Sequence, residues 1–344
     1  MEISELLFRV AILLLAMMPG VVMRLCRLAP TEFGKGISGL VLYIAQPLLV
    51  LYSYLGFKGS LADIWENVLA VLVFSVVAHL VFAAAALGVF RGAPEEKRRM
   101  LRMATVFSNA AFMGIPLIKL LMGAECAIYA SIYNITYNIF LWTFGVHLCT
   151  VKDGEDLDGD GDSDRFDRHL SAKKSLKKHG SGLKVLTHPV TVASALGILC
   201  LIFSVNVDTL QGVGLDIAVQ TLDMLSALVA PLSMIVIGLR IPEIRWRDAL
   251  MDGRMYFFLA LRHLVLPLAV VGIMRLCILV GIPISTDALT VVTILASAPS
   301  ASSCSMFAEK FGCDTAYTGR LVTVSTIVCV ISMPAVLAVA TLGL

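Results

Sequence analysis

Ten runs of mostly apolar residues, each about as long as a lipid bilayer is thick, make up most of this 344-residue sequence. A bilayer core roughly 30 Å thick requires about 20 apolar residues in a helix. The chain is 58% hydrophobic and 15% charged, with a mean hydropathy of +0.87, which excludes an ordinary soluble domain. We predict an all-α integral membrane protein with ten transmembrane helices, near residues 6–26, 37–57, 64–90, 101–122, 125–149, 188–205, 215–239, 253–281, 286–309 and 314–341.

The first run has some features of a secretory signal peptide. Such a peptide begins with a basic segment and ends at a cleavage site flanked by small residues. Here Glu2 and Glu5 precede the apolar run, and no A-x-A-like site follows it. We therefore expect an uncleaved first transmembrane helix.

Basic residues between the runs gather on one side of the predicted membrane. Loops on the cytoplasmic side are enriched in Lys and Arg, so both termini are expected outside, in a multi-pass protein of the cell membrane. The net charge of +2 then reports topology and gives no reason to expect a nucleic-acid partner. The cytoplasmic set comprises Arg24, Arg27, Lys35, Arg91, Lys97, Arg98, Arg99, Arg102, Arg240, Arg245, Arg247, Arg254 and eight more from Lys152 to Lys184, whereas the opposite loops hold little beyond Lys58, Lys119 and Arg275.

One long polar stretch, residues 151–187, separates the fifth run from the sixth. Its acidic first part is followed by a basic second part, which is typical of a cytoplasmic linker. The acidic part also resembles an EF-hand calcium loop, with Gly161 at position 6 but Asp167 where a longer Glu is usual. A solvated charge run is the alternative. The candidate calcium ligands are Asp156, Asp158, Asp160, Asp164 and Asp167.

The eight cysteines offer no second metal site. They are scattered through or beside the apolar runs, without the spacing of a zinc site or a disulfide framework. We interpret them as small apolar residues, and we expect no resident cofactor.

The linker divides the chain into two halves of five runs each, residues 1–150 and 188–344. An odd number of spans makes the second half cross the membrane in the opposite direction to the first, which is the inverted-repeat plan of many secondary transporters. Weak sequence matches favour such a duplication. They pair Pro47 with Pro231, Leu48 with Leu232 and, when Gly123 is laid on Gly312, Glu125 with Asp314.

The fourth run of each half, SNAAFMGIPLIKLLMGAE (108–125) and LASAPSASSCSMFAEKFG (295–312), carries proline and polar residues at mid-depth. Proline breaks a helix, and freed backbone groups are tolerated in a membrane only where protein or a water-filled cavity satisfies them. We predict interruptions near Gly114 to Pro116 and near Ala298 to Ser300. Half-helices that begin there would point positive dipole ends at the midplane and suit a carboxylate. Simple proline kinks are the alternative.

These segments resemble the auxin efflux carrier family and its bacterial branch of anion carriers. The resemblance rests on NAAFMGIPL (109–117), GAECAIYASIYNITYNIFLWTFG (123–145), APLSMIVIGL (230–239), ASAPSASSCSMFAEKFGCD (296–314) and the Ser325-Thr326 pair, and so covers nearly the whole chain. It implies a fold like that of bile-acid carriers, with a dimeric scaffold of spans 1, 2, 6 and 7. Spans 3–5 and 8–10 would form a moving domain in which spans 4 and 9 cross beside the substrate. The short linker departs from the plant hormone exporters, which leaves auxin itself in doubt as substrate.

Polar residues at mid-depth are candidate contacts for a small organic anion. Asn109 matches the family position, and Asn134 and Asn138 lie four apart on one helix face. The alternative is that the amides form interhelical hydrogen bonds and that the serines serve close helix packing. Tyr133 and Tyr137 are interpreted as packing residues. The candidate substrate-binding residues are Gln46, Ser108, Asn109, Gly114, Pro116, Asn134, Asn138, Pro299, Ser300, Ser302 and Ser303.

Three ionisable residues inside the predicted spans are candidates for coupling transport to protons: His79, Arg262 and His263. A histidine titrates near neutrality and can take up a proton. For Arg262 the alternative is a side chain that snorkels to the membrane surface. Sodium, bound by serine oxygens, is the alternative coupling ion.

We therefore expect a secondary carrier of a mono- or dicarboxylate that works by elevator-like alternating access. A sodium symporter for an amphipathic acid and a ligand-sensing receptor are the alternatives, although 37 residues of linker are too short for a signalling domain. An enzyme is not expected, because the sequence contains no H-E-x-x-H, no paired intramembrane aspartates and no G-x-S-x-G on a span.

Overall fold

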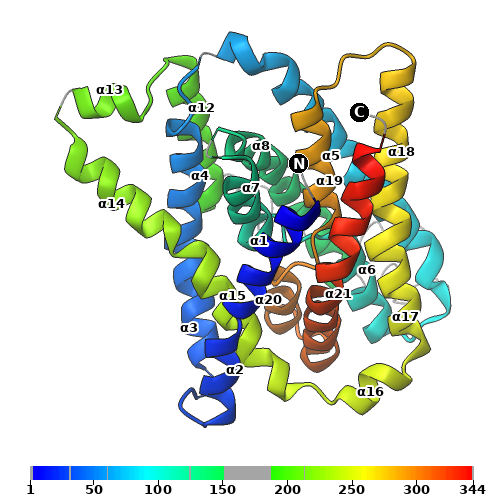
Figure 1. Cartoon of the computed structure of the whole chain (residues 1–344). Coiled ribbons are helices and arrows are strands. Elements are labelled where there is room, and N and C mark those ends of the chain that lie inside the picture. Colours follow the sequence, from blue (N-terminus) through cyan, green and yellow to red (C-terminus); the bar gives the residue numbers. More distant parts are fainter. Residues whose placement is uncertain are drawn as a thin grey trace, which may run out of the picture.

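The computed structural model describes residues 3–30, 32–59, 61–123, 125–150, 187–212 and 214–342. Within these residues the chain is helical, and strand pairing is limited to one antiparallel bridge between Ser108 and Ser300 (Figure 1). The helices of the first half are α1 (Ile3–Leu15), α2 (Met18–Leu25), α3 (Phe33–Leu40), α4 (Gln46–Leu55), α5 (Leu61–Val89), α6 (Glu95–Val106), α7 (Ile115–Met122), α8 (Ala127–Phe140) and α9 (Val146–Thr150). Those of the second half are α12 (Pro189–Ile202), α13 (Val207–Gly212), α14 (Asp216–Ala227), α15 (Val229–Arg240), α16 (Trp246–Met251), α17 (Gly253–Ala260), α18 (Leu266–Leu279), α19 (Thr286–Ser297), α20 (Ser303–Lys310) and α21 (Thr315–Thr341).

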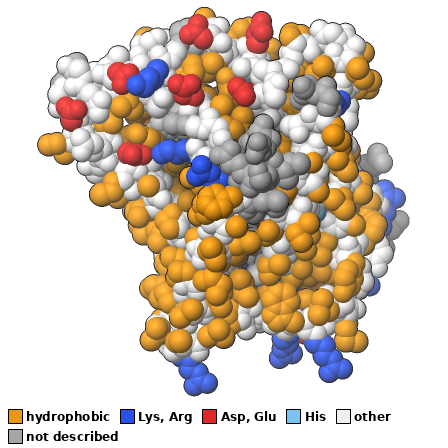
Figure 2. Space-filling model, viewed as in Figure 1, with side chains coloured by type: hydrophobic (Ala, Val, Ile, Leu, Met, Phe, Trp, Pro, Cys, Tyr) orange, Lys and Arg blue, Asp and Glu red, His pale blue; other side chains and the backbone are white. Residues whose placement is uncertain are grey.

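Several helices are long and apolar enough to cross a membrane, as a multi-pass protein requires. In the described part of the chain, five such helical segments span Phe33–Leu55, Leu61–Gly92, Asp216–Glu243, Gly253–Leu279 and Thr315–Thr341, and shorter apolar helices cover Ala11–Leu25, Ala110–Met122, Pro189–Ile202 and Thr286–Ser297. A broad band of hydrophobic side chains covers the face seen in Figure 2. A surface of this kind is stable against lipid tails and would aggregate in water.

Three helical segments accommodate a proline by widening one turn. In three places a five-residue π-helical turn comes directly before a proline that is the second residue of the next α-helix. Proline has no N–H to donate and clashes with the carbonyl four residues earlier, so a wider turn keeps the helix continuous. These turns and prolines are Val41–Ala45 before Pro47, Ala110–Gly114 before Pro116, and Leu261–Val265 before Pro267.

The predicted break at Gly114 to Pro116 is therefore wrong. The chain leaves the helix earlier, because Phe107 has extended backbone angles and Asn109 lies outside the helical region. The second predicted break is confirmed, since α19 ends at Ser297 and α20 begins at Ser303. In the first half, Pro116 follows a π-helical turn and only distorts the helix. The interruption itself, at Phe107 to Asn109, contains no proline.

Four helices pack in two close pairs, α2 against α15 and α4 against α12. Glycines allow this approach: a Cβ on Gly238 would lie 2.0 Å from the backbone oxygen of Met17, and one on Gly20 would lie 2.1 Å from that of Ile235. Small residues commonly let membrane helices approach this closely. A second group consists of α5 against α8 and α19 against α21.

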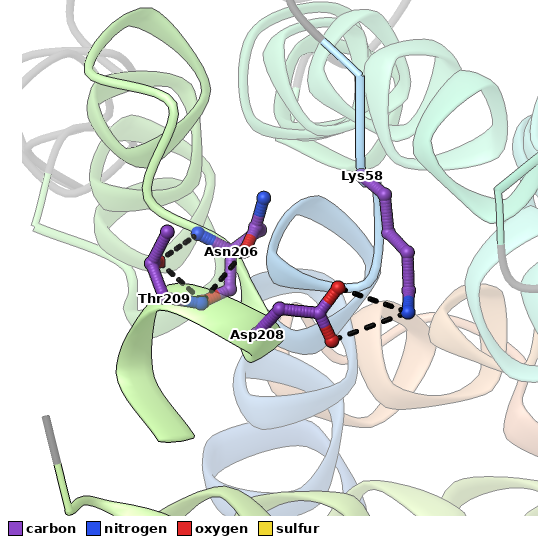
Figure 3. Close-up of polar contacts among 4 residues, drawn as sticks. All are labelled: Lys58, Asn206, Asp208 and Thr209. Carbon is purple, nitrogen blue, oxygen red and sulfur yellow. Dashed lines mark hydrogen bonds and ion pairs between the residues drawn. The ribbon is translucent and has the colours of Figure 1, made fainter. Parts of the chain in front are cut away.

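The short helix α13 is fixed at one end of the molecule by polar contacts (Figure 3). The backbone N–H of Asn206 donates to Thr209 Oγ1 at 2.8 Å, and the Thr209 N–H donates to Asn206 Oδ1 at 2.9 Å, which caps the helix. Lys58 Nζ pairs with Asp208 Oδ2 at 3.0 Å and so ties α13 to the segment after α4. The candidate calcium ligands Asp156 to Asp167, and the linker apart from Thr187, lie outside the described residues.

Candidate substrate site

The two interrupted helices cross where each of them is broken. The Asn109 N–H donates to the Pro299 carbonyl at 2.7 Å, and the Ala301 N–H donates to the Phe107 carbonyl at 2.9 Å. Each break thus supplies hydrogen-bond partners to the other, which meets the requirement that buried backbone groups be satisfied. The crossing residues are buried, and the bridge between Ser108 and Ser300 lies at its centre.

The four helix ends at the crossing differ in what faces them. Arg262 donates to the carbonyls of Ala296 and Ala298 at the end of α19, both at 2.7 Å, and Ser300 Oγ donates to the Ala104 carbonyl near the end of α6 at 2.7 Å. The first N–H groups of a helix have no partner within it and carry partial positive charge. The negative ends are therefore occupied by protein groups, and the two N-terminal ends remain for a ligand.

A cavity of about 420 Å³ lies beside the crossing and is lined by the first turns of both half-helices. Its wall on one side comes from the crossing helices and α8, and on the other from α3, α4, α15 and the start of α12. A volume of this size suits a small organic molecule. The lining residues are Lys35, Ser38, Gly39, Leu42, Tyr43, Gln46, Asn109, Ala111, Phe112, Tyr137, Asn138, Leu141, Trp142, His188, Arg240, Ser303, Met306, Phe307, Glu309 and Lys310.

Amide groups at the inner end of the cavity are free to bind a ligand. Asn109 and Gln46 are each 2% exposed, and within the described residues no hydrogen-bond partner reaches Asn109 Nδ2 or Gln46 Oε1. Buried polar atoms without partners are costly, so a ligand that pairs with them binds with a corresponding gain. Asn138 differs, because its Nδ2 donates to the Asn134 carbonyl at 2.8 Å.

A tyrosine that the sequence assigned to packing contributes to the cavity wall. Tyr137 lines the cavity, and its hydroxyl lies 2.6 Å from Ser303 Oγ. Packing is confirmed for Tyr137, since its ring lies edge-on against Phe107 at 5.8 Å between centroids, but the same residue also meets the cavity. Helical spacing alone does not reveal which part of α8 meets a cavity, since most of its residues are buried.

The cavity also has an aromatic wall and a charged mouth that sequence reasoning missed. Trp142 lies between His188 and Phe307, with ring centroids 5.6 and 5.3 Å away, and Lys310 Nζ lies 4.8 Å from a ring centroid of Trp142. Arg240 projects from the end of α15. The only signal for Arg240 was its place among the basic loop residues, which identified a membrane side and not a cavity.

A second cavity of about 640 Å³ adjoins the first and shares Lys35, Arg240 and Glu309 with it. Lys35 forms an ion pair with Glu309, and Arg24 forms one with Glu243 at the edge of this outer cavity. A polar vestibule thus leads into the amide- and aromatic-lined chamber. Lys35 and Glu309 lie where the two meet.

The predicted site residues fall into two groups. Four of them, Gln46, Asn109, Asn138 and Ser303, line the cavity. The others lie elsewhere: Ser108, Pro299 and Ser300 form the crossing, Ser302 precedes α20, and Asn134 is fully buried. Gly114 and Pro116 lie farther along the continuous helix, where Gly114 packs so closely on Leu295 that a Cβ would lie 2.4 Å from it.

The three ionisable candidates are buried away from the cavity lining. His79 Nδ1 lies 2.7 Å from the Ser75 carbonyl, and its ring contacts Tyr133 with centroids 5.4 Å apart. His263 Nε2 lies 2.8 Å from Ser325 Oγ, which in turn accepts the Ser300 N–H at 2.8 Å. Arg262 is 0% exposed, so the snorkelling alternative is wrong.

Comparison with known proteins places this architecture in a family. A family model described as membrane transport protein matches residues 6–337, nearly the whole chain. No curated protein matches the sequence. The matching family consists of transporters and not of enzymes, in keeping with a buried site that presents amides and helix ends. The chain belongs to the auxin efflux carrier family of membrane transport proteins.

Proposed function

We propose that this transporter is a secondary carrier that moves a small organic anion, a mono- or dicarboxylate, across the cell membrane by elevator-like alternating access. The anion would bind in the inner cavity against Asn109, Gln46 and Ser303. Membrane potential, protons or sodium would drive it, with His79 and His263 as candidate proton carriers.

The first turns of two half-helices, opening onto one cavity, are the observation that carries this proposal. Ala111 and Phe112 of one half-helix, and Ser303 and Met306 of the other, line the same chamber. Each N-terminus contributes about half a positive charge, and the amides of Gln46 and Asn109 add hydrogen-bonding groups. A carboxylate is the small ligand that such a surface stabilises best, because it accepts several hydrogen bonds and carries compensating charge.

The contacts between helices support two inverted repeats of five spans. Exchanging each helix with its counterpart in the other half turns one observed contact into another. The exchanged pairs are α2–α15 with α12–α4, α5–α6 with α18–α19, α5–α8 with α18–α21, α7–α8 with α20–α21, and α6–α21 with α19–α8. A ten-span chain built this way has equivalent inward and outward forms, which alternating access requires.

Ion pairs at opposite ends of the molecule support a fixed scaffold and a moving domain. Lys35 on α3 pairs with Glu309 on α20, while Lys119 on α7 pairs with Asp223 on α14 at 3.2 Å. Each pair joins one of the crossing helices to a helix of the group α1–α4 and α12–α15. Movement of the crossing helices would exchange these contacts, and the static group, which we propose also forms a homodimer, would stay in place.

Charge distribution supports an orientation with both termini outside. In Figure 2 acidic side chains gather toward the upper end of the visible face, together with a few basic ones, whereas the charged side chains that project from its lower end are mostly basic. The chain termini lie in the upper half of Figure 1, away from the basic end. Since Lys and Arg mark the cytoplasmic face, the vestibule around Arg24 and Lys35 would open toward the cytoplasm.

An amphipathic acid is the second candidate substrate class, because aromatic side chains form much of the cavity wall. Tyr43, Phe112, Trp142 and Phe307 offer ring faces to an apolar or aromatic body, while the amides would hold its carboxylate. A small dicarboxylate would leave those faces unused. Sodium-coupled uptake of such an acid is the alternative form of this candidate.

Flux into proteoliposomes tests both candidates. Labelled succinate, malate, benzoate and indole-3-acetate would be offered while membrane potential, pH and sodium are varied separately. We expect at least one of these carboxylates to accumulate; accumulation of succinate or malate favours the small anion, and preference for benzoate or indole-3-acetate favours the amphipathic acid. Binding of an anion without flux under any gradient would favour a ligand-sensing receptor instead.

Replacing Arg240 by glutamine is expected to raise the half-saturating anion concentration roughly threefold to tenfold at low salt, because one cation at the cavity mouth is lost. The effect should shrink as salt screens the charge. Arg245→Gln is the matched control, since Arg245 lines only the outer cavity. Equal behaviour of the two variants across a salt series would exclude Arg240 from the anion path.

A further inference from the structure

Arg262 holds the end of a broken helix from inside the protein. It lies in the π-helical turn Leu261–Val265, between α17 and α18, and is completely buried. Its Nη1 and Nη2 donate to the carbonyls of Ala296 and Ala298, each at 2.7 Å, and its guanidinium carbon lies 4.9 Å from the ring centroid of Phe82. One rigid, planar cation therefore covers the last carbonyls before the crossing.

A buried guanidinium requires compensating negative charge. Among the described residues no Asp or Glu forms an ion pair with Arg262. The negative end of the α19 dipole and the face of Phe82 supply the compensation instead. An uncompensated charge at this depth would cost several kcal/mol, so Arg262 and the α19 terminus depend on each other.

The neighbouring residue fastens the same segment. His263 Nε2 lies 2.8 Å from Ser325 Oγ, which accepts the Ser300 N–H, and His263 Nδ1 lies 3.0 Å from Ser332 Oγ. Two consecutive side chains, Arg262 and His263, therefore hold the stretch from Ala296 to Ser300, the first directly and the second through Ser325. These hydrogen bonds fix the orientation of the backbone groups between α19 and α20.

Exposed carbonyls at the C-terminal ends of broken membrane helices are the groups that coordinate coupling sodium ions in other carriers. In this chain a protein cation already occupies the carbonyls of Ala296 and Ala298. We propose that Arg262 is a resident cation that takes the place of a coupling sodium ion at the crossing. Resting on the anion-carrier function proposed above, this assigns Arg262 as a positioning residue and implies that the folded crossing does not require sodium at the end of α19.

Charge-retaining and charge-removing variants at one position test this assignment. Arg262→Lys keeps the cation, and Arg262→Gln keeps a hydrogen-bond donor without charge. In detergent we expect Arg262→Gln to melt about 5 °C or more below Arg262→Lys, because loss of a buried charge partner is strongly destabilising. Equal melting temperatures, or a more stable glutamine variant, would overturn the role of the charge.

A second arginine in the same helical segment, Gly253–Leu279, provides the matched control. Arg275 also donates to a helix-terminal carbonyl, that of Ala340 in α21, but it is only partly buried. Water screens its charge, so the lysine and glutamine variants at position 275 should melt within about 2 °C of each other. A difference there as large as at position 262 would show that the effect is not specific to the crossing.

Sodium itself is the probe for the second half of the assignment. The melting temperature of the wild-type protein is expected to be the same in sodium chloride and in choline chloride of equal ionic strength. A sodium-specific increase in the wild type would overturn the proposal. These measurements do not involve a carboxylate, so they decide the role of Arg262 even if no carboxylate is transported and the proposed function fails.

Discussion

Replacing Asn109 by alanine is expected to raise the half-saturating concentration of the transported anion about 10- to 100-fold, while the melting temperature of the purified protein changes little. Asn109 Nδ2 is buried beside the cavity and has no hydrogen-bond partner among the described residues, so its removal breaks no hydrogen bond within the protein. A hydrogen bond from an amide to a carboxylate contributes about 1.5–3 kcal/mol, which corresponds to the predicted range.

An isosteric aspartate at this position makes the test sharper. Asn109→Asp has nearly the same shape but places a negative charge against the incoming carboxylate, so transport should fall below detection. Asn67→Ala is the control, because Asn67 donates to the Tyr129 hydroxyl at 3.1 Å and does not line the cavity. Unchanged anion affinity in Asn109→Ala, or improved transport in Asn109→Asp, would contradict an anion site at the crossing.

The helical architecture could be predicted because its cause is local. Apolar runs long enough to cross a bilayer must form helices, so the ranges read from hydropathy lie close to those of the structure, as for 64–90 against Leu61–Val89 and 314–341 against Thr315–Thr341. The second break was also predictable, because Ala298 to Ser300 combines a proline with small polar residues in an otherwise apolar run. Both signals act through the backbone of a single segment.

The first break could not be found by the same reasoning. Pro116 is the obvious disruptive residue, yet a π-helical turn accommodates it. The chain is interrupted instead at Phe107 to Asn109, where Pro299 and Ala301 supply hydrogen-bond partners from a segment almost two hundred residues away. Partners that come from another segment decide the position of this break, and they leave no trace in the local sequence.

The charged mouth of the cavity escaped prediction for a related reason. Lys35, Arg240 and Glu309 belong to three helices that are distant in sequence and meet only in the folded protein. A single sequence shows each as a loop or helix-end charge. By contrast, Asn109 could be identified because an amide inside an apolar run is conspicuous wherever it lies.

Replacing Gly238 by alanine is expected to lower the melting temperature by about 4–6 °C. The added Cβ would lie 2.0 Å from the Met17 carbonyl oxygen and 2.9 Å from its carbon, which belong to the backbone and cannot rotate away. The α2–α15 pair would have to separate, at a cost of about 3 kcal/mol. Thermal unfolding in detergent, followed by tryptophan fluorescence or scattering, measures this loss.

Gly272→Ala is the matched control for this change. Gly272 also lies within a helix, α18, but a Cβ there would meet no heavy atom within 4 Å. Alanine is the better helix former, so this variant should melt at or slightly above the wild-type temperature.

Gly20→Ala tests the same contact from the other helix and should resemble Gly238→Ala, because its Cβ would meet the Ile235 carbonyl oxygen at 2.1 Å. Melting temperatures of Gly238→Ala and Gly20→Ala equal to that of Gly272→Ala would show that α2 and α15 are not in backbone contact. The static group proposed to support the moving helices would then lack the close helix pair on which that proposal relies.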